Sequence, residues 1–176
     1  YPEPLWERIC AHVSAGLPVV AHNAPFELAI WSMLNRRSNY WPRLKVEQTF
    51  CTMALCHAMS LPGKLEKAAL ALRLPFEKDM EGHAIMKKLC KPRKPRKGEP
   101  RDVLLWHEDP SDILRELEYC KKDVEVEREI YKRLLPLSPR ERDYWIIDQR
   151  INTRGLGIDL KNAAICEAAA EQVQEK

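Results

Sequence analysis

The sequence lacks several features that would assign it to a special class of protein. It has no continuous apolar run of about 18 residues, the length at which a helix can cross a membrane. No positively charged start leads into an apolar leader, so no secretory signal peptide is predicted. Glycine is scarce, with 6 residues, and no internal repeat is visible. We therefore expect a globular protein that has no membrane partner.

The 6 cysteines form no C-x-x-C pair. The nearest match to a zinc pattern is Cys51 and Cys56 followed by His57, and this pattern lacks a second half. We interpret the cysteines as reduced thiols of a cytosolic protein, because disulfides are rare in that compartment.

The net charge of +3 is unevenly distributed. Residues 87–101 are strongly basic and contain a single acidic residue, Glu99, while the rest of the chain is net negative. A proline-rich loop of this charge can follow a nucleic-acid backbone, and the alternative is a solvated loop without function. The residues predicted to contact a DNA backbone are Arg93, Lys94, Arg96 and Lys97.

Apolar periodicity and turn residues predict mostly helices. The expected helices cover residues 4–16, 24–36, 49–59, 65–72, 78–89, 112–135, 143–152 and a final run from 162. A short buried strand is expected at 17–21, a loop or short strand at 41–47, and a glycine turn into a strand at 154–159. The prolines that follow the long helix place a domain boundary between residues 136 and 137.

The first informative motif is the segment from His22 to Glu27. It reads as the end of a strand that leads into a helix, with Asn23 as the helix cap and Pro25 in the first turn. Glu27 would then lie near the carboxyl end of the strand, which is where α/β folds bind ligands. Taken alone, Asn23 and Glu27 are as well explained by capping and by the helix dipole, and His22 by a satisfied histidine at a strand end.

The second motif places Tyr119 and Asp123 four residues apart on the long helix. This spacing puts the phenol and the carboxylate on the same helix face, although such pairs are common on amphipathic helices. The core-facing stripe of this helix is predicted to contain Leu117, Cys120, Val124, Tyr131 and Leu134.

The two motifs together suit the hydrolysis of a phosphodiester. This reaction needs an activated water and a stabilised leaving oxygen, which two divalent cations about 4 Å apart can provide. Such cations prefer carboxylate oxygens that converge from separate elements. Glu27 and Asp123 are the candidate carboxylates, and Tyr119 is a candidate for orienting the water.

Nearly the whole chain resembles the 3′–5′ exonuclease domain of phage-type family A DNA polymerases, within the DEDD superfamily. Residues 19–27 resemble the second motif of that group, and residues 119–129 resemble its third motif in the tyrosine form. Residues 52–55, 61–65 and 78–82 resemble stretches typical of these phage enzymes. Residues 138–155 resemble the start of a polymerase domain.

The resemblance implies an α/β fold of the ribonuclease-H-like exonuclease type, with an exonuclease domain at 1–136 and the start of a polymerase domain at 137–176. It implies a proofreading nuclease that uses two Mg²⁺ or Mn²⁺ ions and releases nucleoside monophosphates from a single-stranded or frayed DNA 3′ end. By position, Glu27 and Asp123 would bind metal, and Tyr119 would orient the water. His22, Asn23 and Phe26 would contact the terminal nucleotide. The setting would be the cytoplasm of a bacterial host, with the polymerase domain in cis.

Two departures from the family pattern stand out. Many members have Asp where Glu27 stands, and no Asp-x-Glu pair precedes His22. We therefore interpret the chain as a fragment that lacks the first-motif strands, is helix-rich for that reason, and is inactive, weakly stable or aggregating on its own. Two alternatives remain: a module that holds single-stranded DNA without cutting it, and a stand-alone ribonuclease of the same superfamily.

Overall fold

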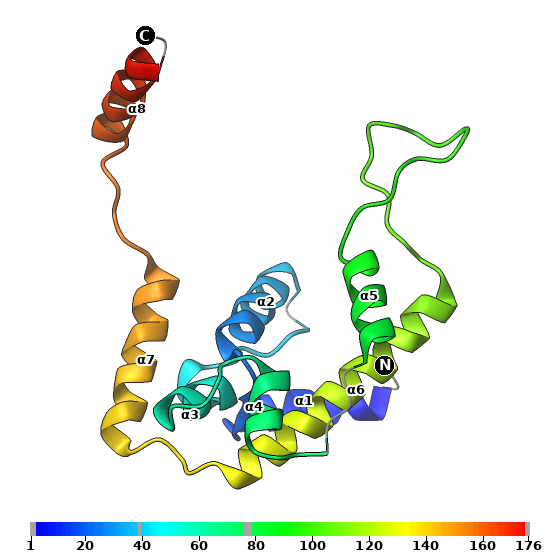
Figure 1. Ribbon diagram of the computed structural model, residues 1–176, viewed down its shortest axis with the longest axis vertical. Helices are drawn as coiled ribbons and strands as arrows, with labels where there is room; N and C mark the ends of the chain where they lie inside the picture. Colours follow the sequence, from blue (N-terminus) through cyan, green and yellow to red (C-terminus); the bar gives the residue numbers. More distant parts are fainter. Residues whose placement is uncertain (1–2, 39, 76–78, 175–176) are drawn as a thin grey trace. The chain divides into compact units, whose positions relative to one another are not determined.

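The computed structural model describes residues 3–38, 40–75 and 79–174, which divide into two compact units, Tyr1–Ser138 and Pro139–Lys176 (Figure 1). The division lies close to the predicted domain boundary. It assigns no activity to either unit, so the identities of the two domains stay predictions.

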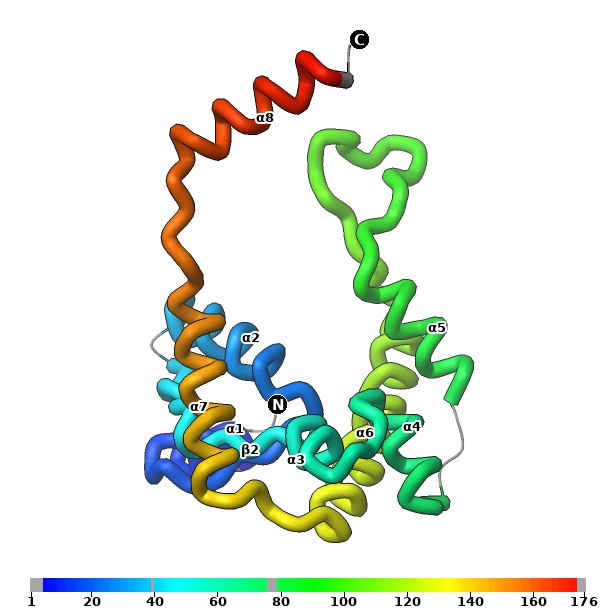
Figure 2. Tube along the Cα trace, turned by 60° about the vertical axis from the view of Figure 1, so that its left-hand side comes forward, coloured from blue at the N-terminus to red at the C-terminus, as the bar shows by residue number. Residues whose placement is uncertain are grey.

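The first unit consists of helices around a very small sheet, and the second consists of two helices (Figures 1 and 2). In chain order the elements of the first unit are α1 (Glu3–Ser14), β1 (Val19–Ala21), α2 (Ala24–Arg37), a 3-10 turn (Val46–Gln48), β2 (Thr49–Cys51), α3 (Thr52–Ala58), α4 (Leu65–Ala71), α5 (Met80–Leu89) and α6 (Pro110–Arg133). The second unit contains α7 (Pro139–Arg154) and α8 (Leu160–Gln174). None of the described helices is long and apolar enough to cross a membrane.

The sheet pairs β1 with β2 in parallel, and α2 forms the crossover between them. Val20 lies opposite Phe50 in this register, and Ala21 lies opposite Cys51. The expectation of a helix over 49–59 is therefore wrong at its start, because residues 49–51 form the second strand and the helix begins at Thr52. The β-propensity of Thr49 and Phe50 was the available signal. The βαβ arrangement is compatible with the predicted α/β class, but the ribonuclease-H-like fold itself stays a prediction.

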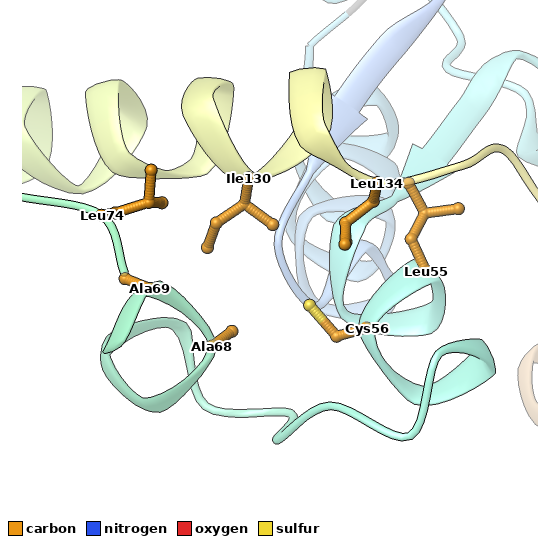
Figure 3. Close-up of a cluster of buried hydrophobic side chains, with 7 residues drawn as sticks. All are labelled: Leu55, Cys56, Ala68, Ala69, Leu74, Ile130 and Leu134. Atoms are coloured by element: carbon orange, nitrogen blue, oxygen red, sulfur yellow. The ribbon is translucent and has the colours of Figure 1, made fainter. Parts of the chain in front are cut away.

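The best-packed core lies between α3, α4 and the C-terminal half of α6 (Figure 3). Ile130 of α6 is fully buried there. Ala68 and Ala69 of α4 are also fully buried, and their small side chains let the two helix backbones approach closely. The cluster is completed by Leu55, Cys56, Leu74 and Leu134. This core fixes the C-terminal half of α6.

Aromatic rings form a second cluster where α1 and α2 meet the loop after α2. Trp6 stacks on Tyr40 with ring centroids 5.4 Å apart, and Trp31 meets Trp41 edge-on at 5.0 Å. The indole N–H of Trp31 donates to the carbonyl of Pro42 at 2.6 Å. These contacts tie α2 to α1 and to the loop that follows α2.

The predicted core-facing stripe of α6 is mostly wrong. Of its five residues only Leu134 is buried, whereas Leu117 and Val124 are 51% and 52% exposed. The face turned toward the rest of the unit contains Tyr119, Asp123 and Ile130 instead. Among the described residues the rest of the predicted stripe is exposed, and the face that contains Tyr119 and Asp123 packs inward.

Three element boundaries also differ from expectation. The cap of α6 is Asp109 and not Ser111, because the Ser111 backbone N–H and hydroxyl both donate to the Asp109 carboxylate. In the second unit, α7 already begins at Pro139, where proline is tolerated in the first helical turn. Gly155 has a left-handed φ of 72° as predicted for a glycine turn, but residues 156–159 form no strand.

Candidate functional site

The site begins at the junction of β1 and α2, where His22 is held by two side-chain hydrogen bonds. Its Nε2 donates to the carbonyl oxygen of Gly63 at 2.7 Å, and its Nδ1 lies 2.8 Å from the Thr52 hydroxyl. A carbonyl can only accept, so Nε2 has the proton and Nδ1 accepts from Thr52. Burial lowers the pKa of His22, which favours this neutral form. Both ring nitrogens therefore have protein partners. The contact of His22 with a nucleotide stays a prediction.

Asn23 does not cap α2 in the way the sequence suggested. It adopts a left-handed conformation with φ 65° and ψ 45°, and its side chain makes no capping hydrogen bond. Asparagine is among the few residues that tolerate this region of backbone space. This conformation makes the sharp turn from β1 to α2, and the side-chain amide of Asn23 is not used to cap the helix.

Glu27 lies in the first turn of α2 with one carboxylate oxygen, Oε2, buried and without a hydrogen-bond partner. Burial raises the pKa of this carboxyl group. A buried acceptor without a partner is costly, and it is the kind of group that a cation or an ordered water satisfies. Phe26, the preceding residue, is 61% exposed and presents its ring to solvent.

Tyr119 and Asp123 share one face of α6, as predicted, and this face is turned inward. Burial, followed by the charge of Asp123 and a hydrogen bond to it, raises the pKa of Tyr119 to about 12. The phenol is therefore a hydrogen-bond donor to the carboxylate at neutral pH. Burial also raises the pKa of Asp123, although the Tyr119 hydrogen bond and the nearby imidazoles of His83 and His22 oppose the rise. The third motif is thus within electrostatic reach of the second.

Glu127 is the residue that the sequence reasoning missed. It lies one turn beyond Asp123, and its carboxylate lies against the backbone N–H of His22, a contact that opposes the rise of its pKa. Burial, reinforced by the neighbouring charge of Glu27, raises the pKa of Glu127 to about 7. The available signal was the four-residue spacing, which places Tyr119, Asp123 and Glu127 on the same face of α6.

The structure therefore brings His22, Glu27, Asp123 and Glu127 to one place, although it does not form a complete metal centre. Among residues 3–38, 40–75 and 79–174, no group of three or more His, Cys, Asp or Glu side chains is arranged to hold a metal ion. The donors that are present are carboxylates, and Glu27 has one buried oxygen without a partner, which is the chemistry that a hard divalent cation prefers. These carboxylates could supply part of the ligand set of a divalent cation.

The basic loop between α5 and α6 has an internal brace. The guanidinium of Arg93 donates to both carboxylate oxygens of Glu99, at 2.6 and 2.8 Å, and its Nε donates to the carbonyl of Trp106. Arg93 also forms an isolated bridge with Leu105. Arg93 therefore organises the loop. The other three predicted DNA-contacting residues, Lys94, Arg96 and Lys97, are exposed.

Comparison with known proteins relates the chain to a polymerase. It is 34% identical over 167 residues to a DNA polymerase of Bacillus phage SP02, and the match covers 92% of this chain and 25% of that protein. The chain thus spans about a quarter of the length of this relative. No family model matches, and no solved structure matches. The similarity supports a polymerase-related segment of phage type, without specifying which activity the segment has.

Proposed function

We propose that this chain is the 3′–5′ exonuclease part of a phage-type DNA polymerase and that it proofreads the growing strand. The supporting observation is that Tyr119 and Asp123 of α6 lie beside the β1–α2 junction that contains Glu27, in a chain related to a phage polymerase. The two motifs are remote in sequence, and either alone has an ordinary structural explanation. Their approach in space supports a shared site.

In this proposal Asp123 and Glu27 bind Mg²⁺ or Mn²⁺, together with carboxylates from outside the described set. The cations supply charge stabilisation and lower the pKa of a bound water. Tyr119, which is protonated at neutral pH, would orient the attacking water through its hydroxyl. Glu127 lies close enough to Glu27 for their charges to interact, so it adjusts the charge at the edge of the site.

The proposed substrate is a single-stranded or frayed DNA 3′ end. The exposed ring of Phe26 offers a face on which the terminal base can stack, and Asn23 offers an amide that is not used as a helix cap. The proposed products are nucleoside monophosphates. The polymerase domain is proposed to follow in cis, in the cytoplasm of a bacterial host of the phage or prophage.

One observation favours a second candidate, a module that holds single-stranded DNA without cutting it. The described residues contain no complete metal-binding group, and a stacking ring with a basic loop is sufficient for binding. This candidate differs from the first in one property, the loss of nucleotides from the 3′ end.

The test is shortening of a 5′-labelled single-stranded DNA by the full-length product of the open reading frame that contains this chain. We expect a ladder that shrinks from the 3′ end with Mg²⁺ and is abolished by EDTA and by Asp123→Ala. Glu118→Ala, an exposed acid on the same helix, is the matched control and should leave the ladder intact. DNA binding without shortening in the wild-type protein would contradict the nuclease and support the binding module.

A further inference from the structure

Helix α5 lies against α6 (Figures 1 and 2). It meets the face of α6 that contains Tyr119. The contact is made by Gly82, a buried residue in the first turn of α5. A Cβ atom at Gly82 would lie 2.6 Å from Cδ2 of Tyr119 and 2.9 Å from both its Cβ and Cγ. These distances are far shorter than van der Waals contact. Only glycine therefore allows α5 to close over the tyrosine ring.

The beginning of α5 is also tied to α6 on both sides of Tyr119. Asp79 caps α5 by accepting from the Gly82 N–H at 2.8 Å, and the same carboxylate accepts from Arg115 Nη2 at 2.5 Å. Its other oxygen faces Lys122 Nζ at 3.4 Å. Arg115 precedes Tyr119 by one turn and Lys122 follows it by about one turn. The Arg115 hydrogen bond is the largest of the effects that hold the pKa of Asp79 well below its usual range.

We propose that Asp79 and Gly82 are positioning residues for the nuclease reaction, acting through Tyr119. This inference rests on the proposed function. Gly82 fits against the ring from Cβ to Cδ2, and the Asp79–Arg115 pair prevents α5 from moving away. With the ring fixed in this way, the hydroxyl of Tyr119 stays directed at Asp123.

Two acids near the start of α5 face Arg115, and only one of them holds the helix firmly to α6. Glu81, the residue before Gly82, also faces Arg115, but at 3.5 Å and with a side chain that is 76% exposed. A solvent-exposed ion pair of this kind contributes little to the stability of the α5–α6 contact. Asp79 and Glu81 therefore both face Arg115, which makes Glu81 a suitable control for Asp79. Only Asp79 also caps α5 while it binds α6.

The test uses the full-length protein with 3-fluorotyrosine in place of tyrosine, in which Tyr119→Phe assigns the Tyr119 resonance. Gly82→Ala is compared with Gly157→Ala, a glycine that has no atom within 4 Å of an added Cβ and no positive φ. Asp79→Asn, which keeps an acceptor for the Gly82 N–H, is compared with Glu81→Gln. Each variant is assayed for the Tyr119 fluorine shift and for kcat and KM on single-stranded DNA.

We expect Gly82→Ala and Asp79→Asn to move the Tyr119 resonance and to lower kcat about tenfold or more with little change in KM, as displacement of an orienting group does. The Gly157 and Glu81 variants should match the wild type. An unmoved Tyr119 resonance, or a moved resonance with unchanged kcat, in either variant would overturn the inference. A wild-type protein that does not shorten DNA would instead refute the proposed function. Asp79→Asn leaves the packing intact, so it decides the matter if Gly82→Ala fails to fold.

Discussion

The carboxylate of Glu127 on α6 lies against the backbone N–H of His22, which follows β1. This contact joins the end of β1 to α6, so it links the two motifs through the main chain. The geometry of the site therefore depends on a residue to which the sequence reasoning gave no role. Because Glu127 is also close to Glu27, a change in its charge acts on both the stability and the electrostatics of the site.

The raised pKa of Glu127 predicts a pH-dependent loss of stability. Since burial raises it from 4.5 to about 7, the folded state holds this proton more tightly than the unfolded state does. The contribution is fully present below about pH 4.5 and is lost as the pH rises to about 7. Because the group is partly solvated, we expect the loss to be on the order of 1–2 kcal/mol.

Glu127→Gln keeps the acceptor for His22 but removes the titration. Urea unfolding of the full-length protein in EDTA, between pH 5 and 8, should show a smaller decline in stability for this variant than for the wild type. Glu125→Gln, on the exposed side of the same turn, is the control. Parallel pH profiles for the wild type and the Glu127 variant would contradict the prediction.

The core cluster predicts that two isoleucines of α6 differ greatly in their effect on stability. Ile130 is fully buried among α3 and α4, whereas Ile113 is 43% exposed. Ile130→Ala should lower the free energy of unfolding by about 2–5 kcal/mol, since it leaves a cavity. Ile113→Ala should cost less than about 1 kcal/mol, as expected near the surface. The midpoints of denaturant unfolding measure the stability lost in each variant. Equal losses would contradict the placement of the core around Ile130.

In the basic loop Arg93 is paired with Glu99, whereas Arg96 and Lys97 are exposed. We therefore expect the exposed charges to contribute to DNA binding more than Arg93 does. Arg96→Ser combined with Lys97→Ser removes two exposed charges, so the slope of log affinity against log salt should flatten by about 1 to 1.5 for single-stranded DNA. Fluorescence anisotropy across a salt series measures this slope. Arg36→Ser combined with Arg37→Ser, exposed on α2, is the control. An unchanged slope in the loop variant would leave the loop as a solvated segment without a role.

The exposed stripe of α6 predicts the behaviour of this 176-residue chain when it is produced alone. Leu117, Val124 and Tyr131 are all at least 40% exposed on one side of the helix. An uncovered apolar surface of this kind promotes association. We expect the chain to bind a hydrophobic dye and to self-associate with rising concentration in light scattering, and Leu117→Gln with Val124→Gln to reduce both effects. A monomeric chain with a sharp, two-state unfolding transition would contradict this expectation.

The sequence predicted the local parts of the site well and their surroundings poorly. The β1–α2 junction and the shared face of Tyr119 and Asp123 follow from turn residues and helical spacing, which are local properties. The orientation of α6 was predicted wrongly because apolar periodicity identifies a stripe without identifying what covers it. The stripe with Leu117 and Val124 is uncovered here, and the polar face is turned inward.

Other features depend on contacts between distant segments, which a single sequence does not reveal. Glu127 gains its importance only from its contact with the N–H of His22, and Gly82 only from its contact with Tyr119. In sequence both look like ordinary helical residues. The second strand was missed because residues 49–51 are continuous with a helix, and only pairing with β1 distinguishes them.

The contact between His22 and Glu127 also constrains the timing of biosynthesis. Roughly 100 residues separate the two partners, and a ribosome adds about 5–20 residues each second. The strand and the first half of the site therefore leave the ribosome on the order of 5 to 20 seconds before the helix that completes it. During that interval the β1–α2 junction has no carboxylate to accept its N–H, so the nascent chain must wait for α6 before the two halves can assemble.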